Sequence, residues 1–107
     1  MEFQLGSALL DACVLAVLAQ DDCYGYSLTA KLREVVAISE STLYPVLRRL
    51  QKDGLLDTYD QPYQGRNRRY YRITDSGRAQ AASYQEQWQQ FKKQIDTLLQ
   101  GAEHDDR

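Results

Sequence analysis

The spacing between apolar residues changes twice along this chain of 107 residues, and the changes limit the folds open to it. Up to Gly54 apolar residues recur every three or four positions, which is typical of helices. From Leu55 to Thr74 they alternate with polar residues, as in a strand with one buried face. Helical spacing then returns as far as Leu99. This order predicts a mainly α chain of the α+β class, with three helices, a small β-hairpin and a long C-terminal helix.

The first helical segment, SALLDACVLAVLAQ at residues 7–20, is apolar nearly all round and is interrupted only by Asp11. A helix of that kind is buried on more than one side. The following DDCYGYS predicts a turn, with Ser27 as the N-cap of a second helix.

The third helical segment has one apolar stripe, and Gly54 supplies its end. Ser39 and Ser41 are both candidates for its N-cap. Pro45 would cost about 3 kcal/mol in a helix interior, so we expect the helix to begin only shortly before it, at residues 39–41. The stripe is formed by Leu43, Val46, Leu47 and Leu50.

Residues 55–60 and 68–74 predict the two strands of a hairpin, joined by a long tip, QPYQGRN. A last helix begins with Thr74 or Asp75 as its cap, and residues 101–107 are expected to fray. We divide the chain accordingly into residues 1–74, residues 75–100 and the tail.

Positive charge is concentrated around this hairpin, although the formal net charge of the chain is −2. Residues 48–78 contain eight basic and four acidic side chains, whereas residues 1–30 contain no lysine or arginine. Three helices followed by a basic hairpin is the plan of a winged helix-turn-helix, in which the third helix enters the major groove of DNA. Ser39, Ser41, Tyr44 and Arg48 are candidates for contacts with bases and phosphates. A charged turn that binds nothing and a Tyr44 ring that only packs remain the alternatives.

Three stretches, YGYSLTAKL, STLYPVLRRLQKDGLL and GRNRRYYRITDSGR, resemble the PadR family of transcriptional regulators, in particular its short members with a single C-terminal helix. The resemblance covers residues 7–98. It implies a winged-helix homodimer that represses genes and is released by small aromatic effectors. Carried over by motif, the DNA-binding positions are Ser41, Thr42, Tyr44 and Pro45 on the helix and Gly65, Arg66, Arg68 and Arg69 on the wing.

The last helix carries a seam of apolar residues spaced three and four apart, which is typical of a helix that packs on a partner. We expect each chain's last helix to lie against the first helix of the other chain, including Leu10, in a homodimer. The seam consists of Ala81, Tyr84, Trp88, Phe91, Ile95 and Leu98. In short relatives of the PadR family a similar tryptophan lines a drug pocket, so Trp88 and Tyr84 are predicted to meet a planar ligand near Leu9 and Ala12. A Trp88 that only fills the interface is the alternative.

Other function classes lack the residues they need. Cys13 and Cys23 form no metal-binding pattern, and the only histidine, His104, lies in the polar tail. We therefore expect no metal, no cofactor and no catalysis. The longest apolar run is too short to span a membrane, and the start is not that of a signal peptide, so we expect a cytoplasmic protein. The alternative function is a winged-helix module that binds an acidic protein partner instead of DNA.

Overall fold

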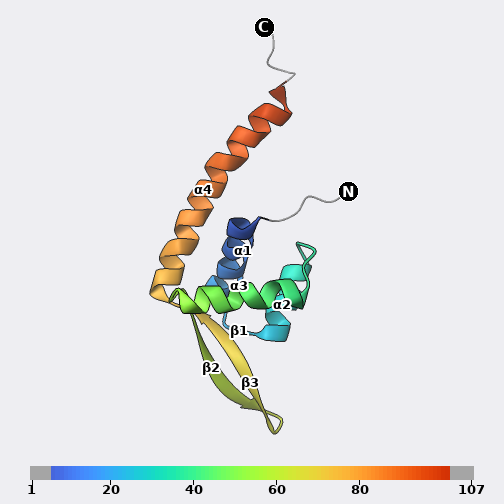
Figure 1. Ribbon diagram of the computed structural model, residues 1–107, viewed down its shortest axis with the longest axis vertical. Coiled ribbons are helices and arrows are strands. Elements are labelled where there is room, and N and C mark those ends of the chain that lie inside the picture. The colour runs from blue at the N-terminus through green and yellow to red at the C-terminus, as the bar shows by residue number, and fades with distance from the viewer. Residues whose placement is uncertain (1–5, 102–107) are drawn as a thin grey trace.

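The computed structural model describes residues 6–101 and has the predicted α+β architecture (Figure 1). The hairpin projects from one end of the body and the last helix from the other. The predicted frayed tail falls mostly on residues 102–107, outside the described part. In chain order the elements are α1 (Ser7–Gln20), β1 (Cys23–Tyr24), α2 (Gly25–Arg33), α3 (Glu40–Lys52), β2 (Leu56–Tyr63), β3 (Arg66–Ile73) and α4 (Asp75–Leu99).

The core lies where α1, α2 and α3 meet the inner face of the sheet. Helix α1 is its centre, since Val14, Leu15 and Leu18 are almost fully buried. The prediction that α1 is covered on several sides is therefore confirmed, because it contacts α2, α3, β3 and α4. Its neighbours in the core are Leu28 and Leu32 of α2, Leu43, Val46, Leu47 and Leu50 of α3, and Cys23, Leu56 and Ile73 of the sheet.

The sheet has three strands where the sequence predicted two. Cys23 and Tyr24 pair with Tyr71 and Tyr70 of β3, giving the order β1-β3-β2. Helix α2 begins at Gly25, so the predicted cap at Ser27 was wrong. A strand of two residues is too short to show a period of alternation. It forms because it pairs with β3, which is far away in the sequence.

The tip of the hairpin is a two-residue turn, not the long loop that the sequence predicted. Gln64 and Gly65 have φ angles of 51° and 79°, as a type I′ turn requires. The pairing continues to Tyr63 and Arg66. No core covers the outer half of the ribbon, so its residues do not alternate between apolar and polar. The strands predicted from that alternation were therefore shorter at the tip than the observed ones. We call residues 56–73 the wing.

Two hydroxyl caps set the starts of α3 and α4. Ser39 accepts a hydrogen bond from the backbone N–H of Thr42 and is the cap of α3. Thr74 accepts one from Gly77 and also donates to the carbonyl of Gly54. A Cβ on Gly77 would lie 2.2 Å from the carbonyl oxygen of Leu55, so only glycine allows α4 to start this close to the wing.

Candidate nucleic-acid interface

The side of α3 that faces away from the core carries the predicted polar and basic residues. Ser41, Pro45 and Arg48 are exposed there. The hydroxyls at the start of the helix are partly engaged with one another, since the oxygen of Ser39 lies 3.0 Å from that of Ser41 and 3.1 Å from that of Thr42. Ser39 therefore shapes the helix terminus, whereas Arg48 extends freely from the following turns.

Tyr44 lies at the junction between α3 and the sheet. It is 39% exposed, and a Cβ on Gly25 would lie 3.8 Å from its hydroxyl oxygen. The pKa of Tyr71 on the inner side of β3 is raised, mainly by burial. The positive charges of Arg69 and Arg48 oppose this rise in the pKa, and Tyr44 adds to it. Tyr44 thus keeps part of its ring exposed while its hydroxyl lies beside the start of α2.

The three wing arginines that the sequence assigned to DNA binding do not share one face. Side chains alternate along β3, so Arg66 and Arg68 lie on one side and Arg69 on the other. Arg69 shares its side with Tyr71 and with the buried Ile73, the side turned toward the helices. Tyr70 lies on the outer side, so the predicted alternation of the tyrosines is present, although both rings stay half-buried.

The outer side of the sheet is covered by a tyrosine–arginine face, made of Tyr24, Tyr59, Tyr63, Tyr70, Arg68 and Arg72. The guanidinium of Arg68 lies between two rings, 4.1 Å from the centre of Tyr24 and 3.7 Å from that of Tyr63. Tyr59 and Tyr70 stack at 5.4 Å. Two cation–ring contacts thus hold the Arg68 guanidinium on the outer side of the sheet.

Ion pairs remove only part of the positive charge. Arg49 is held by Asp11 at 2.7 Å, so it is turned away from the exposed side of α3. Arg69 and Arg72 lie 3.7 and 4.0 Å from Asp60 and Asp57, but all four side chains are more than half exposed, and such pairs are weak. Within residues 6–101 no carboxylate lies within ion-pair distance of Arg48, Lys52, Arg66 or Arg68.

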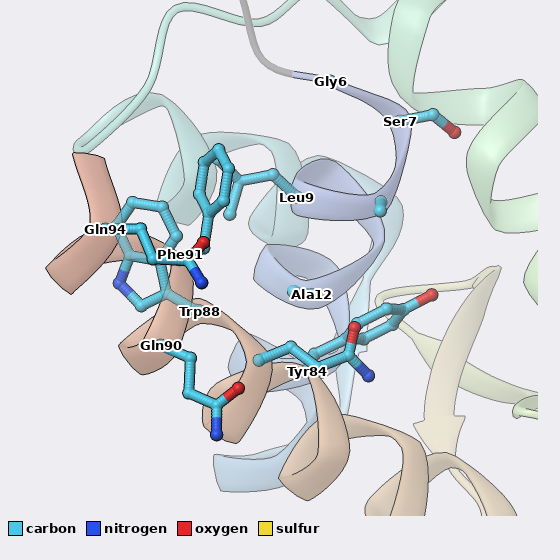
Figure 2. A pocket seen from close by; sticks show the side chains of 11 residues that line it. Gly6, Ser7, Leu9, Ala12, Tyr84, Trp88, Gln90, Phe91 and Gln94 are labelled. Atoms are coloured by element: carbon cyan, nitrogen blue, oxygen red, sulfur yellow. The ribbon is translucent and has the colours of Figure 1, made fainter. Parts of the chain in front are cut away.

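A pocket of about 720 Å³ lies between α1 and α4 (Figure 2). It brings together the four residues that the sequence assigned to a ligand, Leu9, Ala12, Tyr84 and Trp88. Phe91 completes its apolar wall, with its ring centre 6.4 Å from that of Trp88. The pocket is open to solvent, and glutamines 87, 90 and 94 form its polar rim.

The apolar seam of α4 divides into two halves. Ala81 and Tyr84 pack against the core of their own chain. Farther along, Trp88, Phe91 and Leu98 are 40%, 53% and 76% exposed, and Ile95 is half-buried. Leu10, which the sequence assigned to a dimer interface, lies in the core of its own chain with 5% of its surface exposed.

Sequence reasoning missed the ion pair and the tyrosine–arginine face. Asp11 was a usable signal, because a carboxylate in an otherwise apolar helix needs a cation, but nothing in the sequence selected Arg49 from the nearby arginines.

Burial raises the pKa of both cysteine thiols, which makes them weak nucleophiles. The described residues contain no cluster of metal-ligating side chains and no helix long and apolar enough to cross a membrane.

Comparisons with known proteins point in one direction. The model of the family described as "Transcriptional regulator PadR-like family" matches residues 14–83. An uncharacterized protein of Lysinibacillus sphaericus is 32% identical over 88% of this chain and 91% of its own. The transcriptional regulator Rv3488 of Mycobacterium tuberculosis is 42% identical, covering 73% of this chain and 72% of that protein.

Solved structures agree with this likeness. The crystal structure of smu.1704 from Streptococcus mutans has a TM-score of 0.86 and 38% identity, over 94% of this chain and 95% of that one. A PadR family transcription regulator from Clostridium difficile has a TM-score of 0.80 and 28% identity, over 88% of this chain and 99% of that one.

The Arg68 sandwich predicts a local effect on the wing. Arg68→Ala removes two cation–ring contacts, each worth about 0.5 to 1 kcal/mol at an exposed site. We expect opening of the wing to become about 5- to 30-fold more frequent, measured by amide hydrogen exchange in β2 and β3. Arg69→Ala is the control, because it removes the same charge from the opposite side of β3. Equal exchange in both variants would show that the sandwich contributes nothing.

Proposed function

The chain belongs to the PadR-like family of transcriptional regulators, and from this premise we propose that it is a dimeric repressor whose operator affinity falls when a planar aromatic ligand binds. The family is one of regulators and not of enzymes. Residues 1–74 would bind DNA and residues 75–100 would form the dimer. Its place of action is then the cytoplasm, with the DNA.

The observation that carries the DNA-binding proposal is the distribution of unpaired cations. Arg48 lies on the exposed side of α3, Arg66 is exposed at the tip of the wing, and Arg68 lies half-buried over two tyrosine rings. None of the three is within ion-pair distance of a described carboxylate. Phosphate contacts by such side chains position a protein on the duplex. We therefore propose α3 as the recognition helix, in the major groove, with the wing on the flanking backbone or minor groove.

The proposal gives the exposed residues two kinds of role. Ser41, Thr42 and Tyr44 are candidates for base or phosphate contacts, Pro45 lies beside them inside the helix, and Ser39 caps its start. On the wing, Gly65 allows the tip to approach a groove closely, and Arg66, Arg68 and Arg69 reach phosphates from both sides of the ribbon. The alternative function, binding of an acidic protein through the same cations, predicts no strong preference for a duplex.

The first test is the salt dependence of duplex binding. The unmodified protein should bind DNA from upstream of its own gene with an affinity that falls steeply as salt rises. Arg66→Ala together with Arg68→Ala should flatten the slope of log affinity against log salt by about 1 for each phosphate that the variant no longer neutralises. Lys93→Ala, which removes an exposed charge from α4, is the control and should leave the slope unchanged. A nearly flat slope for the unmodified protein would favour the protein-binding alternative.

The dimer proposal rests on the outer half of the α4 seam. Trp88 and Phe91, which line the pocket beside α1, and Leu98 and Leu99 farther along α4 are all large apolar side chains with much of their surface exposed. Patches of that kind mark interaction sites. A two-fold axis near Trp88 would let the outer half of each α4 pack on the partner, and would place the two recognition helices one turn of DNA apart.

Ile95→Asp should abolish both association and operator binding, because it places a charge in the apolar seam. Sedimentation at micromolar concentration should show a dimer for the unmodified protein and a monomer for this variant. Thr97→Asp, which puts the same charge on another side of α4, should remain dimeric. A monomeric unmodified protein would refute the proposal.

The ligand proposal rests on the pocket between α1 and α4. Two copies of Trp88 near a two-fold axis would offer flat faces for a ring, and each aromatic pair adds about 0.5 to 1.5 kcal/mol beyond the area that it buries. The ligand can release DNA only if it prefers one spacing of the recognition helices. If Trp88 only fills the interface, no such binding occurs.

Trp88 is the only tryptophan, so its fluorescence reports on the pocket directly. Planar drugs and phenolic acids should quench it below millimolar concentration, aliphatic acids of similar charge should not, and the quenching compounds should lower operator affinity. Trp88→Leu, followed by calorimetry, should weaken binding of the same compounds. Quenching that leaves operator affinity unchanged would contradict a role in release.

A further inference from the structure

Helix α1 holds one buried charge, and α3 supplies its partner. Asp11 is 4% exposed, and both of its oxygens accept hydrogen bonds from Arg49, at 2.7 and 2.9 Å. A bidentate pair of this kind fixes the orientation of the guanidinium as well as its distance. The pair therefore restrains both the rotation of α3 about its own axis and its distance from α1.

Adjacent arginines on α3 consequently have different partners. Arg48 is exposed and has no carboxylate within ion-pair distance among the described residues. Arg49 is directed at α1, and its hydrogen bonds to Asp11 are the main cause that raises its pKa. Arg48 is thus available to DNA, whereas Arg49 helps to determine the direction in which α3 presents Arg48.

The same turn of α1 forms the wall of the α1–α4 pocket. Ala12, the residue after Asp11, lines the pocket together with Tyr84. In Figure 2 the Tyr84 ring passes beside Ala12 and its hydroxyl points away from Trp88. Tyr84 also packs against the core cluster to which Leu10 and Val14 of this part of α1 belong. A group that displaces Tyr84 or this turn therefore acts on the environment of the ion pair.

We propose that Asp11 and Arg49 are positioning residues that hold the recognition helix on α1, and that they transmit changes in the α1–α4 pocket to DNA binding. The inference rests on the proposed DNA-binding function. It supplies the physical link that release requires, because two sites are coupled only through an element whose arrangement both of them bias. The pair does not itself contact DNA.

The first experiment compares two variants of neighbouring residues. Arg49→Gln alone would leave a buried carboxylate unpaired and could unfold the chain, so it is combined with Asp11→Asn, which keeps a neutral hydrogen-bonded pair. This double variant should bind all duplexes with an unchanged salt slope but discriminate about 5- to 10-fold less between the upstream DNA and a shuffled duplex. Arg48→Gln should instead reduce the slope by about 1. Circular dichroism and sedimentation establish that each variant is folded and has the same oligomeric state.

Three outcomes separate the claims. A slope reduced by about 1 in the Asp11→Asn, Arg49→Gln variant would show that Arg49 contacts phosphate, and unchanged discrimination would show that the pair only stabilises the fold. Either result overturns the inference and leaves the proposed function standing. Failure of the unmodified protein to bind duplex DNA overturns both.

The second experiment uses a mutation as the pocket occupant, so that no ligand has to be identified. Ala12→Leu fills the space beside Tyr84 and should lower discrimination for the upstream DNA by about 5-fold, a coupling of the size seen between residues in contact. In the Asp11→Asn, Arg49→Gln background that effect should largely disappear. Ala16→Leu, at an exposed position of α1 outside the pocket, is the control and should have little effect in either background. An equal effect of Ala12→Leu in both backgrounds would show that the signal bypasses the ion pair.

Discussion

The burial of α1 on several sides is the constraint on which the rest of the structure depends. The helix contacts α2, α3, α4 and the middle strand, so each of these elements takes its position from the same fourteen residues. Asp11 lies on the buried side of this helix with 4% of its surface exposed, and it is tolerated there because α3 brings Arg49 to it. The packing of a small core thus determines the direction in which the exposed side of α3 points.

The wing is stabilised in a different way, because most of it projects from the body and is not packed against the core. A two-stranded ribbon is only marginally stable by itself. Here the base of the ribbon is held by β1 and by the buried Leu56 and Ile73, while the outer half is covered by stacked tyrosines and by Arg68 between two rings. The arginines that make the wing basic therefore also help to keep it ordered. Local charge of this kind is compatible with an acidic chain, since binding depends on the field at one face.

The sequence predicted those elements that have a periodic pattern of apolar residues or a local capping residue. The periods of α1 and α3, and the hydroxyls of Ser39 and Thr74, placed both ends of α1 and the starts of α3 and α4 within one residue, because caps and stripes are local signals. The strand at Cys23 and Tyr24 and the tight turn at Gln64 and Gly65 were missed, since one depends on a distant partner and the other follows strands without an apolar face. The pairing of Asp11 with Arg49 joins residues 38 positions apart and could not be read from spacing.

Helix α4 is clamped at one end and free at the other. Its first turn meets the backbone of Leu55 so closely that Gly77 has no room for a side chain, and Arg78 binds the carbonyl of Ala19. A helix of 25 residues is about 37 Å long, so it acts as a lever arm in which a tilt of about 5° at the base moves the far end by about 3 Å. A small change in packing at the base of α4 therefore produces a larger displacement of its outer half. In a two-fold assembly, small adjustments at the pocket beside Ala12 would be magnified at the contact between the two chains.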